Sequence, residues 1–369
     1  MPSISCRRTH KLLLWGVAAA GSLFGSGANL LAQTGGVVVR AHEEAPQADE
    51  LTVFGRVVQA GAKVLGKGAK AVSEKEILDA EPRGSSSAAD RKKALALLPL
   101  EHLTPEQRER VASITKNVSY YRRLPKVSFP VEPEVYSYFL AHPDVAVSVW
   151  RAMEISKVEM YQTGRFEYEA DAGDGSVGAI EILYTQGDRH LAICEGSFTS
   201  PLLKQPIEAR SLLLLQTSFI TEPDGTVSVS HRGDLFISFP AQTLDVAAKV
   251  FSPLTVSLTD RTFTEVSMFV RMMSLAMSRR PDWVEQMAGK MTGVPDLRKQ
   301  QMLDLSSAMH VRAVQRAADQ AGLELGEFPA AQPASASSTQ SAGGGRAEIA
   351  PPPRRLPTRG PVTPGPVTP

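Results

Sequence analysis

Residues 157–170 read KVEMYQTGRFEYEA, and residues 226–239 read TVSVSHRGDLFISF. Apolar and polar side chains alternate in both segments, as they do in a half-buried antiparallel strand. The region from Lys157 to Phe239 therefore predicts a curved or open antiparallel sheet. The apolar faces of the two segments hold Val158, Met160, Phe166, Tyr168 and Ala170, and Val227, Val229, Leu235, Ile237 and Phe239.

Five strands joined by short turns are expected in this region. The first is Lys157–Ala170 and the second is Val177–Gln186, which is followed by the two-residue hairpin loop Gly187-Asp188. This loop would pair the second and third strands so that Tyr184 lies opposite Leu191, Ile182 opposite Ile193 and Ile180 opposite Glu195. Glu195 would then lie on an apolar face.

The fourth and fifth strands flank Glu222-Pro223-Asp224-Gly225, which is typical of a type I turn followed by a glycine with positive φ. The turn predicts the pairs Phe219–Val229, Thr217–His231, Leu215–Gly233 and Leu213–Leu235. In this register His231 faces inward, and we expect Arg232 and Asp234 to form an ion pair on the outward face. Residues 212–215 are apolar on both faces, so the second face also needs a cover.

Helices are expected on both sides of this region in the chain. Thr104-Pro105-Glu106-Gln107 forms a capping box for a helix that runs to about Lys116. A second helix begins near Pro133, and Pro143 should kink or break it. After the strands, Ala241–Phe251 is expected to form a short helix.

A long amphipathic helix is expected over Leu258–Arg279. Its apolar residues recur at three- and four-residue spacing, namely Phe263, Val266, Val270, Met273 and Met277. Further helices are expected to begin at Asp282 and at Pro295, and the last should end near Gly322.

These elements predict an α+β fold, with a five-stranded antiparallel meander sheet packed on the long C-terminal helix and extra flanking helices. The order of elements over Pro133–Arg280 resembles the helix-grip fold of START-like lipid-binding domains, although the usual paired helices between the early strands are missing. The resemblance implies an internal apolar cavity for a lipid or another hydrophobic ligand. The chain also looks like exported bacterial proteins.

The domain organisation follows from changes in composition along the chain. Residues 1–32 have a basic head and an apolar stretch, which predicts a signal peptide and an exported, periplasmic or extracellular protein; an uncleaved N-terminal membrane anchor is the alternative. Residues 33–100 are expected to be a poorly ordered leader, in which 51–72 could form a basic amphipathic helix that contacts a membrane surface. Residues 101–325 are expected to form one α+β domain, and 326–369 a disordered tail rich in Pro, Ala, Ser and Gly.

Charge and cysteine content exclude several classes of function. Lys and Arg number 40 against 39 for Asp and Glu, so no excess positive charge favours nucleic-acid binding. The two cysteines are Cys6 and Cys194, and we expect Cys194 to be a small apolar core residue. We expect no metal or cofactor, and the sequence does not define an oligomeric state. Tyr120-Tyr121-Arg122-Arg123 is interpreted as a packing and ion-pair segment.

The sequence has no nucleophile elbow, no HExxH metal site and no complete phosphate-binding loop. We therefore expect a non-enzymatic binding module that holds a hydrophobic, lipid-like ligand between the sheet and the C-terminal helix. A structural or protein-interaction component of the bacterial envelope and a hydrolase-type enzyme are the alternatives. The candidate ligand contacts are His231, Glu195, Tyr184, Phe219 and Met273. His231 itself could be a satisfied core histidine, a polar anchor in a pocket or a general base.

Overall fold

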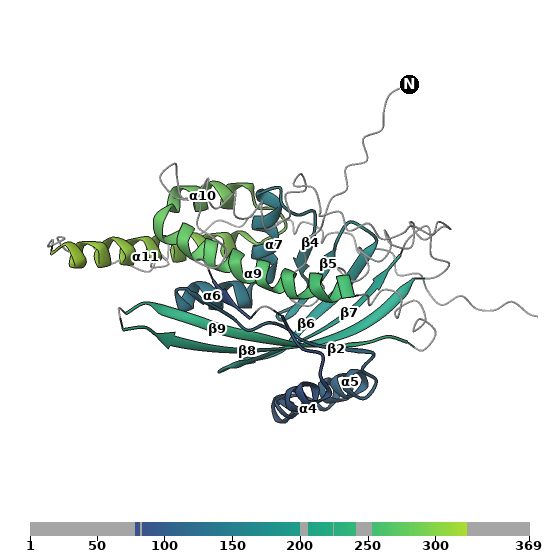
Figure 1. Ribbon diagram of the computed structural model, residues 1–369. Coiled ribbons are helices and arrows are strands. Elements are labelled where there is room, and N and C mark those ends of the chain that lie inside the picture. The colour runs from purple at the N-terminus through teal and green to yellow at the C-terminus, as the bar shows by residue number, and fades with distance from the viewer. Residues whose placement is uncertain (1–77, 82, 200–205, 224, 241–252, 323–369) are drawn as a thin grey trace, which may run out of the picture. The chain divides into compact units, whose positions relative to one another are not determined.

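The computed structural model describes residues 78–81, 83–199, 206–223, 225–240 and 253–322, with the backbone alone for 253–258. The expected signal peptide, the basic helix at 51–72, the helix at 241–251 and the tail at 326–369 lie outside the described residues. Two elements, β1 (Asp79–Ala80) and α4 (Ala88–Ala96), fall within residues 33–100, which we expected to be a leader. The first belongs to the sheet and the second is a helix that covers it (Figure 1).

The described chain is built on a nine-stranded antiparallel sheet, so the α+β class is confirmed, but the sheet has nine strands instead of five. The strand order is β1-β3-β9-β8-β7-β6-β5-β4, and β2 also pairs with β9. The strands are β1 (Asp79–Ala80), β2 (Tyr120–Arg123), β3 (Val127–Pro130), β4 (Glu159–Gln162), β5 (Glu167–Asp171), β6 (Ser176–Gln186), β7 (Arg189–Phe198), β8 (Ile207–Thr221) and β9 (Val227–Ser238).

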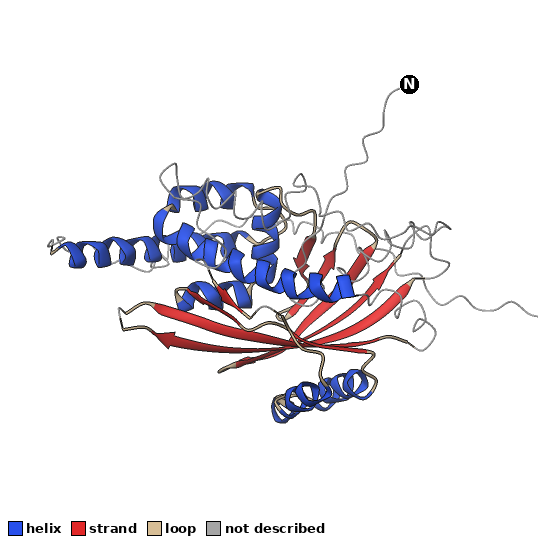
Figure 2. Ribbon diagram, in the orientation of Figure 1, coloured by secondary structure: helices blue, strands red, loops and turns tan. Residues whose placement is uncertain are grey.

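Helices cover both faces of this sheet (Figures 1 and 2). One face is covered by α4 (Ala88–Ala96) and α5 (Pro105–Lys116), which are joined through the short 3₁₀ helix η1 (Leu100–His102). The opposite face is covered by α6 (Pro133–Ala141), α7 (Pro143–Ala152), α9 (Pro253–Arg279), α10 (Pro281–Lys290) and α11 (Asp296–Ala321). No helix within the described ranges combines the length and the apolar character needed to cross a membrane.

Several local predictions are confirmed. The capping box at Thr104 is present, and its helix ends at Lys116. The helix that begins at Pro133 breaks before Pro143, which starts α7. All four predicted β8–β9 pairs occur, and Gly225 has the positive φ of 81° that the turn requires.

The predicted first strand is wrong, because Lys157–Ala170 forms a hairpin of two strands, β4 and β5. Thr163 donates its backbone N–H to the carbonyl of Glu167 over 2.9 Å, which closes the loop between them. Met160 then lies opposite Ala170, and both side chains are buried. Phe166, which we placed on the apolar face, lies in the loop and is 44% exposed.

The predicted β6–β7 register is partly wrong, because β6 contains a bulge between Ile182 and Tyr184. Tyr184 does lie opposite Leu191, but Ile182 pairs with Ala192 and Ile180 with Cys194. The bulge inserts one extra residue into β6. The alternation of side chains between the two faces of the sheet is therefore out of phase before and after the bulge. As a result, Glu195 lies opposite Ala179, on the other face from the buried Ile180 and Cys194.

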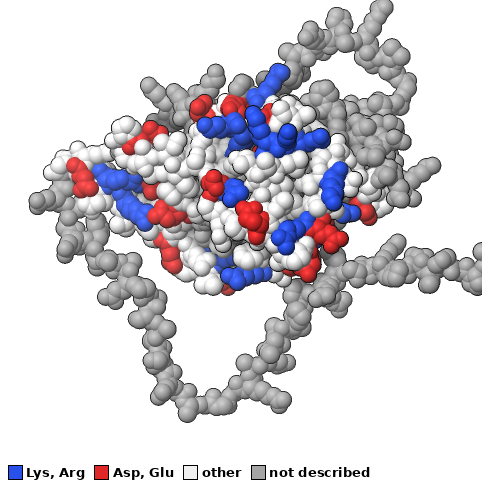
Figure 3. Space-filling view, turned by 90° about the horizontal axis from the view of Figure 1, so that it is seen from below, with Lys and Arg blue, Asp and Glu red and all other residues white. Residues whose placement is uncertain are grey.

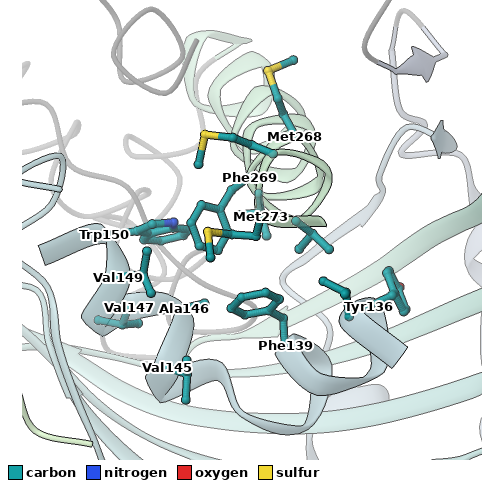
Figure 4. Packing of buried hydrophobic residues seen from close by; sticks show 14 of the residues in the cluster. Tyr136, Phe139, Val145, Ala146, Val147, Val149, Trp150, Met268, Phe269 and Met273 are labelled. Carbon is teal, nitrogen blue, oxygen red and sulfur yellow. The ribbon is translucent and has the colours of Figure 1, made fainter. Parts of the chain in front are cut away.

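The main core lies between the sheet and the α6, α7 and α9–α11 layer, and aromatic rings fill its centre. Phe269 of α9 makes edge-to-face contacts with Phe139 of α6 and Trp150 of α7, with ring centroids 5.6 and 5.3 Å apart (Figure 4). Cys194 belongs to this core, as we expected, and burial raises the pKa of its thiol to about 12.

A second core lies between the sheet and α4–α5, and it provides the cover that residues 212–215 needed. Leu212, Leu214 and Phe236 pack there against Val111 and Ile114 of α5. Leu213 and Leu215 belong to the main core on the opposite face. The two cores explain why this part of β8 is apolar at every position.

The predicted surface pair of Arg232 and Asp234 is wrong. Asp234 is fully buried, and it accepts hydrogen bonds from Tyr121 Oη (2.6 Å), Arg123 Nε (2.9 Å) and Gln216 Nε2 (3.1 Å). Arg232 instead pairs with Glu81. The packing and ion-pair role expected for residues 120–123 is confirmed, because Arg122 also binds Asp260 of α9.

Candidate functional site

The candidate His231 lies in a buried series of hydrogen bonds that links side chains of β8, α6, β9 and α9. Its Nδ1 lies 2.8 Å from Tyr136 Oη and its Nε2 lies 2.8 Å from Ser267 Oγ. Tyr136 Oη is also 3.1 Å from Thr217 Oγ1, and Ser267 Oγ donates to the Phe263 carbonyl over 2.8 Å. The imidazole is 1% exposed.

The acceptor at the end of this chain fixes the direction of every proton in it. Because Ser267 donates to a carbonyl, its oxygen accepts from His231 Nε2–H, and Nδ1 accepts from Tyr136 Oη–H. This arrangement requires a neutral imidazole. Burial lowers the pKa of His231 to about 3, which keeps the ring neutral at physiological pH.

Ser267 is a partner of His231 that the sequence analysis missed. A serine beside a histidine could be a nucleophile with its base, but here the histidine donates to the serine and both side chains are buried. The signal in the sequence was the helical spacing of Ser267 on the inward face of α9, next to Val266 and Val270. The network supports the interpretation of His231 as a satisfied core histidine.

The other four candidate residues do not gather around His231. Phe219 lies nearby, with its ring 5.7 Å from that of Tyr136 in an edge-to-face contact, and it is 43% exposed. Met273 lies in the packed centre of the main core (Figure 4). Tyr184 packs against the second core, and the register places Glu195 on that same face.

Tyr184 and Glu195 belong to a polar surface beside α5. The Tyr184 ring stacks on His102 at 5.0 Å, and Arg110 of α5 binds Glu181 and lies 3.7 Å from Glu195. A hollow of about 430 Å³ next to Tyr184 is lined mainly by polar and charged residues. Figure 3 shows this side of the molecule, where basic and acidic side chains are interspersed.

An apolar pocket of about 50 Å³ lies on the opposite face of the sheet, between β6–β8 and the junction of α6 and α7. The break at Pro143 and the bulge in β6 both border it, because Pro143 and Ile182 line the pocket. The full lining consists of Leu140, Pro143, Met160, Ile180, Ile182, Thr185, His190, Leu191, Ala192, Leu213 and Leu215.

Two polar side chains, Thr185 and His190, stand among these apolar ones. They are cross-strand partners on β6 and β7, and Thr185 Oγ1 lies 2.8 Å from His190 Nδ1. Burial lowers the pKa of His190 to about 4, so this imidazole is also neutral at physiological pH. Within the described part of the chain, its Nε2 has no hydrogen-bond partner.

The helical wall of the pocket is fixed by a buried ion pair. Asp144 follows the wall residue Pro143 and is bound by Arg298 of α11, and Arg298 also donates to Gln162 of β4. Asp144 is fully buried. The start of α7 is therefore tied to two other elements, which gives the pocket a preformed wall.

Among the described residues, no group of three or more His, Cys, Asp or Glu side chains is placed to hold a metal ion. A scan against protein-family models found no match for this chain, and a search of curated protein sequences found none either.

Proposed function

We propose that this protein is a non-enzymatic binding module for a hydrophobic ligand, and that the pocket between β6–β8 and the α6–α7 junction receives part of an alkyl chain. The observation that carries this proposal is an apolar pocket with one neutral polar pair, Thr185 and His190, in its lining. Ligand pockets are typically of this kind, mostly apolar with a few polar groups that fix orientation.

The size of the pocket limits what can enter it. An engineered apolar cavity of ~150 Å³ takes benzene, and this pocket measures about 50 Å³. An aromatic or steroid ring is therefore too wide, whereas the end of an unbranched alkyl chain fits. The remainder of such a ligand would extend from the pocket past the exposed hydrogen-bonded pair of Thr185 and His190.

Thr185 and His190 determine which polar head group the ligand can carry. A neutral imidazole offers one hydrogen bond through Nε2 and no positive charge, so it does not favour an anionic head group. A hydroxyl or a carbonyl is the matching chemistry. The ligand class that fits is a neutral amphiphile with a narrow alkyl chain, such as a fatty alcohol or an acyl ester.

The binding energy can be estimated from the chain length that is buried. Each buried methylene contributes about 0.8 kcal/mol, so affinity should rise about fourfold for each one that enters the pocket. Three methylenes would give about 2.4 kcal/mol, or roughly a 60-fold gain over a ligand that lacks them. The gain should end once the pocket is full.

A series of linear 1-alkanols, from butanol to decanol, tests this proposal by NMR titration of the full chain. We expect the affinity to rise with each added carbon and then to level off, with shifts at the His190 ring and the Thr185 methyl. Ala192→Leu fills the pocket and should weaken binding of octanol at least tenfold. Val177→Leu, at a position on the same sheet that is 45% exposed, is the matched control and should leave binding unchanged. Equal binding by both variants would refute the site.

A further inference from the structure

The hairpin of β8 and β9 has one open edge. On the β7 side, the last residue pair of β8 is Gln216 with Arg189, and the last contact is the Thr217 N–H bonded to the Asp188 carbonyl over 2.8 Å. Ser218, Phe219, Ile220 and Thr221 pair with β9 on their other side only. No described strand pairs with the open side of these four residues.

Alternation along the strand shows which backbone groups this edge offers. Because Thr217 directs its N–H toward the β7 side, Phe219 and Thr221 direct their N–H and C=O groups the same way. The side chain of Phe219 is 43% exposed and that of Ile220 is 53% exposed. The segment has no charge, no proline and no glycine.

This edge lacks three features that commonly prevent strand addition. Exposed edge strands are often protected by lysine, proline or a bulge, because unpaired N–H and C=O groups attract another strand, and none of the three occurs among these four residues. The short length of the edge limits how much of a partner strand it can pair with. Here the open edge has two exposed apolar side chains, one on each face of the strand. A strand is therefore the partner whose chemistry matches it.

We propose that this edge binds the same edge of a second copy of the chain, as an antiparallel pair around a two-fold axis at Ile220. Asp188 already occupies the position beside Thr217, so the added strand has room only from Ser218 onward. Centring on Ile220 pairs Phe219 with Thr221 of the partner subunit, and Thr221 with the partner subunit's Phe219. Each of these pairs can exchange two backbone hydrogen bonds.

The side chains in this register are compatible with a second copy. Ile220 faces Ile220 of the partner subunit, and the aromatic Phe219 faces a β-branched threonine, which are both favourable cross-strand pairs. The uncharged segment creates no repulsion when it meets itself. Four residues from each copy bury much less surface than the ~1,200–2,000 Å² that stable interfaces bury. The dimer should therefore be weak and reversible.

Disulfide trapping of the full chain in a Cys6→Ser background tests the register. Cα atoms of directly opposed residues in a non-hydrogen-bonded pair lie ~4.5 Å apart, which suits a disulfide. Ile220→Cys should therefore form a covalent dimer under mild oxidation. Ser218→Cys is the matched control on the same face, because two such residues would lie about 13 Å apart along the paired strands. The remaining Cys194 is buried.

We expect Ile220→Cys to cross-link at least tenfold faster than Ser218→Cys. Equal rates would overturn the register. Ile220→Lys provides a second test, because it places two like charges opposite each other at an exposed position. Sedimentation velocity over a concentration series should show at least a tenfold increase in the dimer dissociation constant for this variant. Self-association that is unchanged in Ile220→Lys, or absent from the unsubstituted chain, would refute the proposal. Neither result depends on the alkyl-chain pocket.

Discussion

His231 should make the protein sensitive to acid, and the size of the effect follows from its buried network. The pKa of the imidazole is about 3 in the folded chain and ordinarily 6.5 in the unfolded chain. Protonation therefore favours unfolding. The stabilising contribution is complete above pH 6.5 and is lost as the pH falls from 6.5 toward 3.

The magnitude at an accessible pH can be worked out directly. Between pH 6.5 and pH 5 the unfolded chain is protonated at this site and the folded chain is not, so each pH unit costs about 1.36 kcal/mol. The free energy of unfolding should therefore fall by roughly 2 kcal/mol at pH 5 on account of His231 alone. Other groups, including His190 and the carboxylates, add their own pH dependence, so a variant is needed to isolate this part.

His231→Gln removes the titrating ring and retains a polar side chain. Urea unfolding at pH 7 and pH 5 should show that this variant is less stable at pH 7 but loses about 2 kcal/mol less than the unsubstituted chain on acidification. Val284→Ala is the control, at a residue of α10 that is buried in the main core. It should lower the free energy of unfolding by the same amount at pH 7 and pH 5. An equal acid loss in His231→Gln and the unsubstituted chain would refute the buried neutral histidine.

Three further predictions concern single interactions. Asp234→Ala removes the carboxylate that accepts hydrogen bonds from Tyr121 and Gln216, while Arg123 keeps its ion pair with Asp90. It should lower the free energy of unfolding by about 2–4 kcal/mol in urea titrations, whereas a loss below 1 kcal/mol would contradict this buried network. Thr104→Ala removes the capping box of α5 and should cost about 1 kcal/mol in the same assay; an unchanged midpoint would argue against the cap. Gly225→Ala forces a side chain into a backbone with φ of 81° and should cost about 1–2 kcal/mol, which calorimetric melting can detect, and a stabilised variant would contradict the turn.

The parts of the fold that the sequence predicts best are those where a local rule sets the geometry. The turn at 222–225 has one compatible glycine position, and this fixes the register of the whole β8–β9 pair. The capping box at Thr104 and the break at Pro143 are equally local. In each case the preferred backbone conformation of a few residues was enough.

The alternation of apolar and polar residues gave a wrong prediction for residues 157–170, because a hairpin and one long strand can show the same pattern. Residues that face each other across a hairpin share a face, so Met160 and Ala170 stay in phase although the chain reverses between them. Gly164 was the available signal for the loop. The bulge in β6 left a different trace, two adjacent apolar residues at Leu183 and Tyr184 that both pack against the second core.

The remaining strands and the pocket depend on long-range packing. β2 pairs Tyr120 with Ile237, so a four-residue strand gains its structure from a partner more than a hundred positions away. His190 was not a candidate because the expected register, which has no bulge, puts its cross-strand partner Thr185 on the face opposite Ile180 and Ile182. The bulge between Ile182 and Tyr184 brings Thr185 and His190 to the same face as these two isoleucines. The burial of Asp234 likewise depends on α4, α5 and β2, which cover the face of β9 that we expected to point to solvent. The alternation of residues in β9 does not reveal this cover.

The most direct test of the proposed function is to locate an alkyl chain in the protein. Crystals of the full chain soaked with 8-bromo-1-octanol can be examined by anomalous diffraction at the bromine edge. We expect a bromine peak beside Ile180 and Leu213 on the sheet face, and no such peak in crystals of Ala192→Leu. A bromine peak only at another site, or no ordered bromine at saturating ligand, would contradict it.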